Sequence, residues 1–205
     1  MSSVRVSGTE GYAEATEELV SKYESVSFAD IHHPVLHLIP TIPGVVCDIG
    51  SGTGRDAAGL AAMGHRVLAV EPTASLRNRA QVLHPSPSIE WLDDSLPDLR
   101  EVLARGEVFN LVMLTAVWMH LDARQRRRAM PNVARLVRPD GMMIMSLRHG
   151  PVPCGRRMFA VSAEETMQLA EAEGLSVALV CDSPSVSDAN RQAGVSWTRL
   201  AFAKA

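Results

Sequence analysis

Three glycines within five residues, with an aspartate before them and a glutamate further on, are the residues of this chain best suited to holding a ligand. They lie in the stretch VVCDIGSGTGRDAAGLAAMGHRVLAVEP, which runs from Val45 to Pro72. An apolar run, a glycine turn and a helix that begins near Arg55 would present free backbone N–H groups to a ligand at close range. The pattern predicts a nucleotide-type binding site.

Two carboxylates narrow the chemistry of this site. Glu71 ends the second apolar run, 21 residues after Gly50, where an acid suits the ribose hydroxyls of an adenosine group. Asp48 stands directly before the glycines, where it would repel a pyrophosphate and attract an ammonium or sulfonium group. The dinucleotide pattern Gly-x-Gly-x-x-Gly fits this turn poorly. Counted from Gly50, the position of its third glycine is occupied by Arg55, and counted from Gly52, the pattern begins late in the turn.

Short apolar runs alternate with helical patterns along most of the chain. This alternation predicts right-handed strand–helix–strand crossovers and a parallel sheet that is covered by helices on both faces. The last two runs are joined without a helix and should pair antiparallel. Asp122 is expected to cap a helix kinked at Pro131, Ser162 and Glu165 to form a capping box, and RPDG to be a turn. The expected strands are 45–49, 66–70, 89–92, 108–114, 142–147, 175–181 and 195–203.

Length and composition place further bounds on the chain. Its 205 residues suffice for one α/β domain, and the net charge of -3 gives no attraction to nucleic acid or anionic membranes. Three widely spaced cysteines fit neither a disulfide framework nor a zinc site, and we expect no metal. We see no signal peptide and no apolar run of transmembrane length, so we expect a cytoplasmic protein. The expected organisation is a single domain, with a helical cap over 1–43 and a cofactor-binding core over 44–205.

These stretches and those that follow them resemble the class I S-adenosylmethionine-dependent methyltransferases. The stretch VVCDIGSGTGRDA is similar to their motif I, and VLAVEP to their second strand with its ribose-binding acid. IEWLDDSLPDL, FNLVMLTAVWMHL and LVRPDGMMIMSL resemble their third, fourth and fifth strand segments, in the same order. The resemblance covers roughly residues 44–203 and implies a Rossmann-like, doubly wound, seven-stranded, mostly parallel sheet with an antiparallel last strand. It implies S-adenosylmethionine as cofactor and S-adenosylhomocysteine as product.

The resemblance also implies roles for individual residues. The glycine turn would wrap the methionine moiety, Glu71 would take both ribose hydroxyls, and either Asp93 or Asp94 would take the adenine amino group, with Asp94 preferred. The positions that match the family's cofactor contacts are Asp48, Gly50, Ser51, Gly52, Glu71, Pro72, Asp93, Asp94, Ser95, Thr115, Ala116 and Val117.

Arg55 and His120 are candidates on grounds of position. Arg55 could pair with the carboxylate of the cofactor from the helix N-terminus, or could be a solvated first-turn arginine. His120 follows the fourth expected strand, at the edge where open α/β sheets bind ligands, and could contact cofactor or substrate or cap locally.

The loop after the fifth expected strand, RHGPVPCGRRMF, suggests where the methyl acceptor binds. We predict catalytic roles for His149, as the group that takes the acceptor proton, and for Arg148, as the group that holds an anionic part of the acceptor. The alternative is a solvated, arginine-rich loop. Tyr12, Tyr23 and the 182–194 loop would close the pocket.

The function expected from the sequence is transfer of a methyl group from S-adenosylmethionine to O or N of a small polar molecule. The alternatives are a tRNA or protein methyltransferase and a non-catalytic cofactor-binding protein. The chain has no Asn/Asp-Pro-Pro-Tyr after the fourth expected strand, which argues against amino methylation of DNA bases. We expect a small-molecule acceptor as partner, with neither nucleic acid nor membrane, and the oligomeric state stays open.

Overall fold

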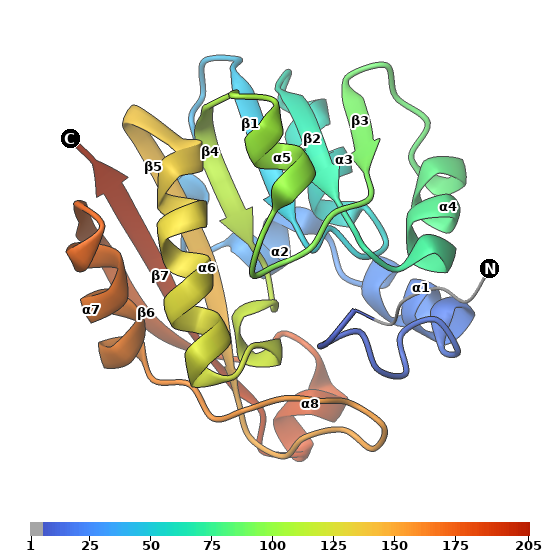
Figure 1. Ribbon diagram of the computed structural model, residues 1–205. Coiled ribbons are helices and arrows are strands. Elements are labelled where there is room, and N and C mark those ends of the chain that lie inside the picture. The colour runs from blue at the N-terminus through green and yellow to red at the C-terminus, as the bar shows by residue number, and fades with distance from the viewer. Residues whose placement is uncertain (1–5) are drawn as a thin grey trace.

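A seven-stranded sheet forms the centre of the molecule in the computed structural model, which describes residues 6–205 (Figure 1). Residues 1–5 of the expected cap lie outside the described part. The strand order is β3-β2-β1-β4-β5-β7-β6, and β7 is antiparallel to both of its neighbours while the other pairs are parallel. The expected fold class is therefore confirmed. The strands are β1 (Val45–Ile49), β2 (Arg66–Val70), β3 (Ile89–Leu92), β4 (Phe109–Leu114), β5 (Val137–His149), β6 (Leu175–Pro184) and β7 (Ser196–Lys204).

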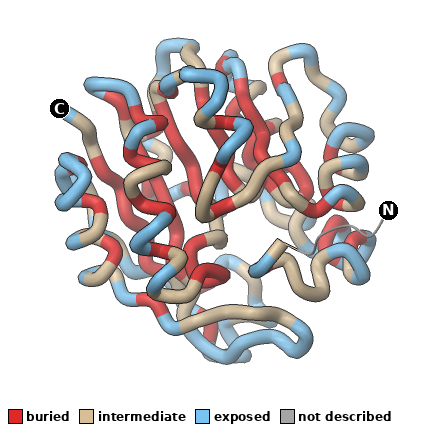
Figure 2. The backbone as a smooth tube through the Cα atoms, viewed as in Figure 1, coloured by how far each residue is buried: buried red, intermediate tan, exposed pale blue. Residues whose placement is uncertain are grey.

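Helices cover both faces of the sheet, because the central strands are apolar on both sides. On one face, α5 (Arg100–Ala104), α6 (Ala123–Leu136) and α7 (Ala163–Ala172) pack on residues such as Met143 and Met145 of β5. On the other face, α3 (Arg55–Ala62) packs against β1, β2 and β3, and Ile144 of β5 and Ala201 of β7 belong to the same apolar layer. Figure 2 shows the buried residues concentrated along the central strands. An apolar layer thus packs on each face of the sheet, and the ends of the strands are left to form a ligand-binding site.

The N-terminal cap consists of α1 (Thr16–Glu24), α2 (Phe28–His32) and a 3-10 turn over Leu36–Leu38. The Thr16 and Ser75 hydroxyls are 2.7 Å apart, which ties α1 to α4 (Ala74–Leu83). His32 Nε2 and Asp56 Oδ2 are 2.8 Å apart in a buried contact between α2 and α3. The N-terminal segment, the 150–158 loop and α8 (Asp188–Gln192) gather at the end of the sheet where β4 ends (Figure 1).

Helix α6 is continuous through Pro131. Two other local expectations needed correction. The RPDG segment is part of β5, where Asp140 has a φ of 59° and the pairing with β4 skips from Val137 to Met142. A short helix, α8, lies between β6 and β7, and the Ser187 side chain accepts a hydrogen bond from the Asn190 N–H at its start.

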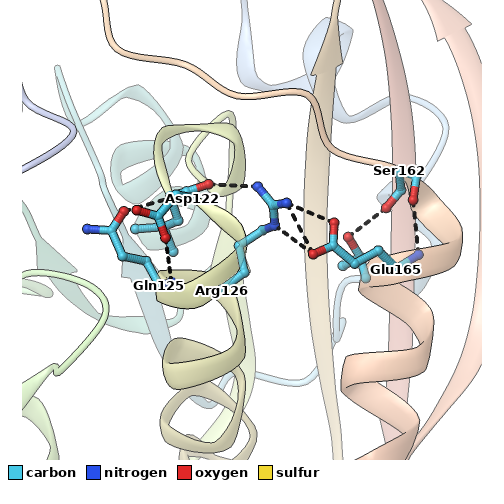
Figure 3. A network of polar contacts seen from close by, with 7 residues as sticks. Asp122, Gln125, Arg126, Ser162 and Glu165 are labelled. Atoms are coloured by element: carbon cyan, nitrogen blue, oxygen red, sulfur yellow. Dashed lines mark hydrogen bonds and ion pairs between the residues drawn. The ribbon is translucent and has the colours of Figure 1, made fainter.

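A buried arginine joins α6 to α7 (Figure 3). Asp122 and Gln125 form a reciprocal capping box at the start of α6. The Arg126 side chain is 4 % exposed and donates hydrogen bonds to both carboxylate oxygens of Glu165, at 2.8 and 3.1 Å. The Ser162 side chain accepts from the Glu165 N–H at 3.1 Å. Only this half of the expected Ser162–Glu165 capping box forms, because the carboxylate pairs with a guanidinium instead of a neutral N–H.

Among residues 6–205, no helix combines the length and the apolar character needed to cross a membrane.

Candidate active site

A cavity of about 520 Å³ lies between the carboxyl ends of β1, β2, β4 and β5, the cap, and α8. Loops at this edge of a parallel sheet lie close together in space, which explains why segments far apart in the chain meet here. The sequence-predicted residues that line the cavity are Asp48, Gly50, Ser51, Gly52, Arg55, Glu71, Pro72, Thr115, Ala116, Val117, His120 and Arg148.

The glycine turn brings backbone close to a neighbouring loop at one point and leaves room at the next. Gly50 has a φ of +72°, and a Cβ there would lie 2.5 Å from Cγ2 of Val117. Gly52 has a φ of +56°, and no described atom lies within 4 Å of the place its Cβ would occupy. Because Gly52 also lines the cavity, the turn leaves open space where a ligand can approach the backbone.

Backbone groups hold the Glu71 carboxylate in place. Glu71 is 5 % exposed. Its Oε2 accepts a hydrogen bond from the Gly52 N–H at 2.9 Å, and its Oε1 accepts one from the Thr73 N–H at 2.7 Å. Burial raises the pKa of Glu71, and the two backbone donors partly offset this rise. Each carboxylate oxygen has a second lone pair, so Glu71 can accept further hydrogen bonds from a ligand.

Asp48 is a buried carboxylate in need of a partner. It is 1 % exposed, and its Oδ2 has no hydrogen-bond partner within residues 6–205. Burial raises the pKa of Asp48 well above its usual range; Asp56 and Glu71 add to this rise, and Arg55 opposes it. A cation bound in the cavity would stabilise the ionised form, so Asp48 fits a ligand that carries an ammonium or sulfonium group.

We expect Asp48→Asn to stabilise the ligand-free protein increasingly as the pH rises. The folded protein holds the Asp48 proton more tightly than the unfolded chain does. The parent therefore loses stability as the pH rises from the unfolded pKa of Asp48 through its raised folded pKa, and asparagine has no proton to lose. Urea unfolding of both proteins between about pH 5 and pH 8 measures the difference. A difference that stays constant with pH would show that Asp48 does not titrate abnormally.

The two candidate adenine-binding acids lie in different environments. Asp94 and Ser95 line a small recess that shares Gly50 and Pro72 with the main cavity, whereas Asp93 lies in neither space. Asp93 pairs with the Arg77 guanidinium at 2.8 Å. Of the two acids, Asp94 is thus the one placed beside the cavity.

The Asp94 carboxylate is already used within the fold. It accepts backbone N–H groups of Ser95, Glu101 and Val102 at 2.7, 2.8 and 3.0 Å, and so anchors the start of α5. Oδ2 accepts two of these groups and Oδ1 accepts one, so Oδ1 can still accept a further donor, as the adenine amino group would require.

Arg55 and His120 both line the cavity, and each already makes hydrogen bonds within the fold. Arg55 Nε donates to Asp56 Oδ1 at 2.8 Å and Nη1 to the Tyr23 carbonyl at 3.1 Å, so Arg55 is not a solvated arginine. His120 Nδ1 lies 2.8 Å from the Arg157 carbonyl, which can only accept. Nδ1 therefore carries the hydrogen, and Nε2 accepts from the Tyr12 hydroxyl at 2.9 Å.

Burial lowers the pKa of His120, which favours the neutral ring. Its basic nitrogen is the one bonded to Tyr12, and both residues line the cavity. A proton that arrives through the Tyr12 hydroxyl can thus be held at Nε2 of His120.

The structure separates the two residues expected to be catalytic. Arg148 and His149 are consecutive residues of β5, and consecutive side chains of a strand point to opposite faces. Arg148 lines the cavity, where burial lowers its pKa and Nη1 donates to the Pro151 carbonyl at 2.8 Å. His149 is not among the lining residues, and its Nε2 lies 2.8 Å from Oγ1 of Thr198. The geometry therefore does not support His149 as the group that takes the acceptor proton.

Ser185 and Asn190 line the cavity from the 182–194 segment, which was expected to close the pocket. Trp197 and Arg199 reach the cavity from β7 and were not singled out from the sequence. No local motif marks them, because they arrive only through the pairing of β5 with β7. Within the described residues, no group of three or more His, Cys, Asp or Glu side chains could hold a metal ion.

Comparisons with known proteins agree with this arrangement. A family model described as "Methyltransferase domain" matches residues 46–141. A comparison with curated proteins found no match.

Similar solved structures, at 16–21% identity, share the fold. A TehB-like SAM-dependent methyltransferase from Corynebacterium glutamicum has 19% identity and a TM-score of 0.71, over 94% of this chain and 99% of that one. The 1,6-didemethyltoxoflavin-N1-methyltransferase of Burkholderia thailandensis has 21% identity and a TM-score of 0.66, over 100% and 93%. The N-methyltransferase NodS from Bradyrhizobium japonicum has 16% identity and a TM-score of 0.71, over 94% and 98%.

Proposed function

We propose that this chain, which matches a methyltransferase-domain model over residues 46–141, is a class I S-adenosylmethionine-dependent methyltransferase that binds its cofactor in the cavity and methylates a small polar molecule at oxygen or nitrogen. The observation that carries the proposal is the convergence of the open glycine turn, Glu71 and the unpartnered Asp48 on one cavity. In this proposal residues 44–205 form the catalytic core and residues 1–43 the cap.

The residues present suit the chemical groups of the cofactor. The open space over Gly52 would receive the methionine moiety, and Asp48 would face its cationic part. Glu71 would accept the ribose hydroxyls, and the recess beside Asp94 and Ser95 would receive the adenine ring. Arg55, at the start of α3, would lie near the carboxylate of the cofactor. When bound, the cofactor supplies an electrophilic methyl carbon.

The protein would then act mainly by positioning the acceptor and excluding water. Holding two reactants in line can contribute roughly 7–11 kcal/mol of the barrier in such reactions. The cap lines the cavity through Tyr12, Leu19 and Tyr23, so an acceptor must fit beneath it. This covering by the cap favours a small acceptor rather than a folded RNA or protein. The Burkholderia neighbour is named for a small heterocycle as its acceptor, in keeping with this proposal.

S-adenosylmethionine and S-adenosylhomocysteine are expected to raise the melting temperature, and NAD is not. At a ligand concentration one hundred times the dissociation constant, the gain in unfolding free energy is about 2.7 kcal/mol. For a chain of this size that gain corresponds to a shift of roughly 5–10 °C. Thermal melts with each ligand measure it. A shift with NAD and none with S-adenosylhomocysteine would overturn the assignment.

A labelled-cofactor experiment separates the three classes of function. Protein carrying cofactor with a labelled methyl group is mixed with fractionated cell extract under single-turnover conditions. Label in the small-molecule fraction supports the proposal. Label in tRNA or protein contradicts the small-molecule acceptor, and label in no fraction indicates a protein that binds the cofactor without turnover.

A further inference from the structure

An unpaired buried arginine lies in the part of the cavity wall that β7 forms. Arg199 of β7 is 5 % exposed and lines the cavity. Its Nε has no hydrogen-bond partner, and no carboxylate within residues 6–205 forms an ion pair with it. Burial lowers the pKa of Arg199 to about 10, so the side chain remains charged at neutral pH. A buried charge without a counter-ion is costly, which points to a ligand that supplies one.

The pairing of β5 with β7 places a second arginine beside the first. Ser146 lies opposite Arg199 in the antiparallel ladder, and Arg148 lies opposite Trp197. Residues directly opposite one another share a face of the sheet, so all four side chains project on the cavity side. All four line the cavity, and the Arg199 guanidinium carbon lies 5.4 Å from the centre of the Trp197 ring.

The charged residues that line the cavity come unevenly from the two halves of the chain. Asp48, Asp56 and Glu71 line it around the glycine turn and the start of α3. From residue 115 onward, the described lining residues include Arg148, Arg156 and Arg199 but no carboxylate.

The charged groups that act most on Arg199 are already partnered within the fold. Asp56, the carboxylate that most favours the charged form of Arg199, is itself bonded to His32 and Arg55. Arg156, another cation that lines the cavity, stacks on the Tyr12 ring with its guanidinium carbon 4.1 Å from the ring centre and donates to the Glu10 carbonyl. The Asp56 carboxylate therefore does not serve as the counter-ion of Arg199.

We propose that Arg199, together with Arg148, binds a carboxylate of the methyl acceptor, with Trp197 against the ring or apolar body that carries it. The guanidinium fork matches the two oxygens of a carboxylate, and the flat face of tryptophan suits a planar group. A singly charged carboxylate fits better than a phosphate dianion, because Nη1 of Arg148 is already engaged by the Pro151 carbonyl. This inference rests on the proposed function only in taking the anion to be the methyl acceptor.

Benzoate and benzamide test the site, because they share a ring and differ in charge. Each is titrated calorimetrically into the full chain, with and without saturating S-adenosylhomocysteine. We expect benzoate to bind at least tenfold more tightly than benzamide. Equal affinity of the unmodified protein for the two probes would overturn the proposal, without any measurement on a variant.

Arg199→Gln should weaken benzoate binding at least tenfold while it changes S-adenosylhomocysteine affinity less than twofold. Arg138→Gln is the matched control, since Arg138 is an exposed arginine of β5 outside the cavity. It should change neither affinity. Unaltered benzoate binding in Arg199→Gln would overturn the assignment of Arg199. If that variant fails to fold, Arg199→Lys keeps the charge without the fork and should still weaken benzoate binding.

Inorganic phosphate is the third probe. Phosphate binding that depends on Arg199 and excludes benzoate would overturn the carboxylate assignment in favour of a phosphate ester. Binding of benzoate without any binding of S-adenosylhomocysteine would contradict the proposed function and leave the anion site intact, so the two failures are distinguishable.

Discussion

We expect Gly52→Ala to weaken S-adenosylhomocysteine binding strongly and to leave the protein folded. The alanine Cβ would meet no described atom, and it would occupy the open space over the turn that the cofactor is proposed to fill. The backbone at Gly52, with a φ of +56°, costs an alanine roughly 1–2 kcal/mol of unfolding free energy. We expect an affinity loss of at least a hundredfold, about 2.7 kcal/mol, measured by calorimetry.

Gly106→Ala provides the matched control. Gly106 has a φ of +64°, again with no atom within 4 Å of its Cβ position, and it does not line the cavity. Both variants should lower the melting temperature to a similar extent, because they carry the same backbone strain. Only Gly52→Ala should lose the ligand, and parental affinity in that variant would show that the cofactor lies elsewhere.

Glu71→Ala is expected to weaken both cofactor binding and folding. The variant removes the acceptor of two ribose hydroxyls, and hydrogen bonds to a charged group contribute about 1.5–3 kcal/mol each. We therefore expect at least a hundredfold loss of S-adenosylhomocysteine affinity, measured by calorimetry. The variant also leaves the Gly52 and Thr73 N–H groups without their acceptor, so urea unfolding without ligand should show lower stability.

Glu71→Gln separates the two effects. The amide oxygen can accept one of the two backbone N–H groups, while the amide nitrogen faces the other donor, so stability should be only partly restored. Affinity should stay well below that of the parent, because one of the two acceptor oxygens is lost. Parental affinity in both variants would show that Glu71 serves the fold alone.

Features that depend on short stretches of chain could be predicted from the sequence. The glycine turn, the positions of Asp48 and Glu71, and the strand–helix alternation all follow from local spacing, and the structure has each of them. The N-cap of α6 at Asp122 was equally predictable, because the hydrogen bond that it accepts from the Gln125 N–H lies within one turn.

Features that depend on distant partners could not be predicted in the same way. The sequence places Arg148 and His149 side by side, and only the register of β5 decides which one faces the cavity. Arg199 pairs with Ser146, a residue 53 positions earlier in the chain, and no local pattern encodes this pairing. The Glu165 carboxylate leaves its own capping box for Arg126, a residue of another helix.

The position of β7 between β5 and β6 has a consequence for the order of assembly. Strand β7 is the last in the chain, yet it lies between β5 and β6 in the sheet. Until β7 pairs with them, β5 and β6 each have an unpaired edge. Such non-local pairing is slow, and β5 carries three methionines, an isoleucine and a leucine, so its open edge exposes the nascent chain to aggregation during this interval. Arg199 and Trp197 arrive only with that insertion. A chain that has formed β1, β2 and β4 would thus possess the glycine turn and Glu71 before it possesses any place for an acceptor.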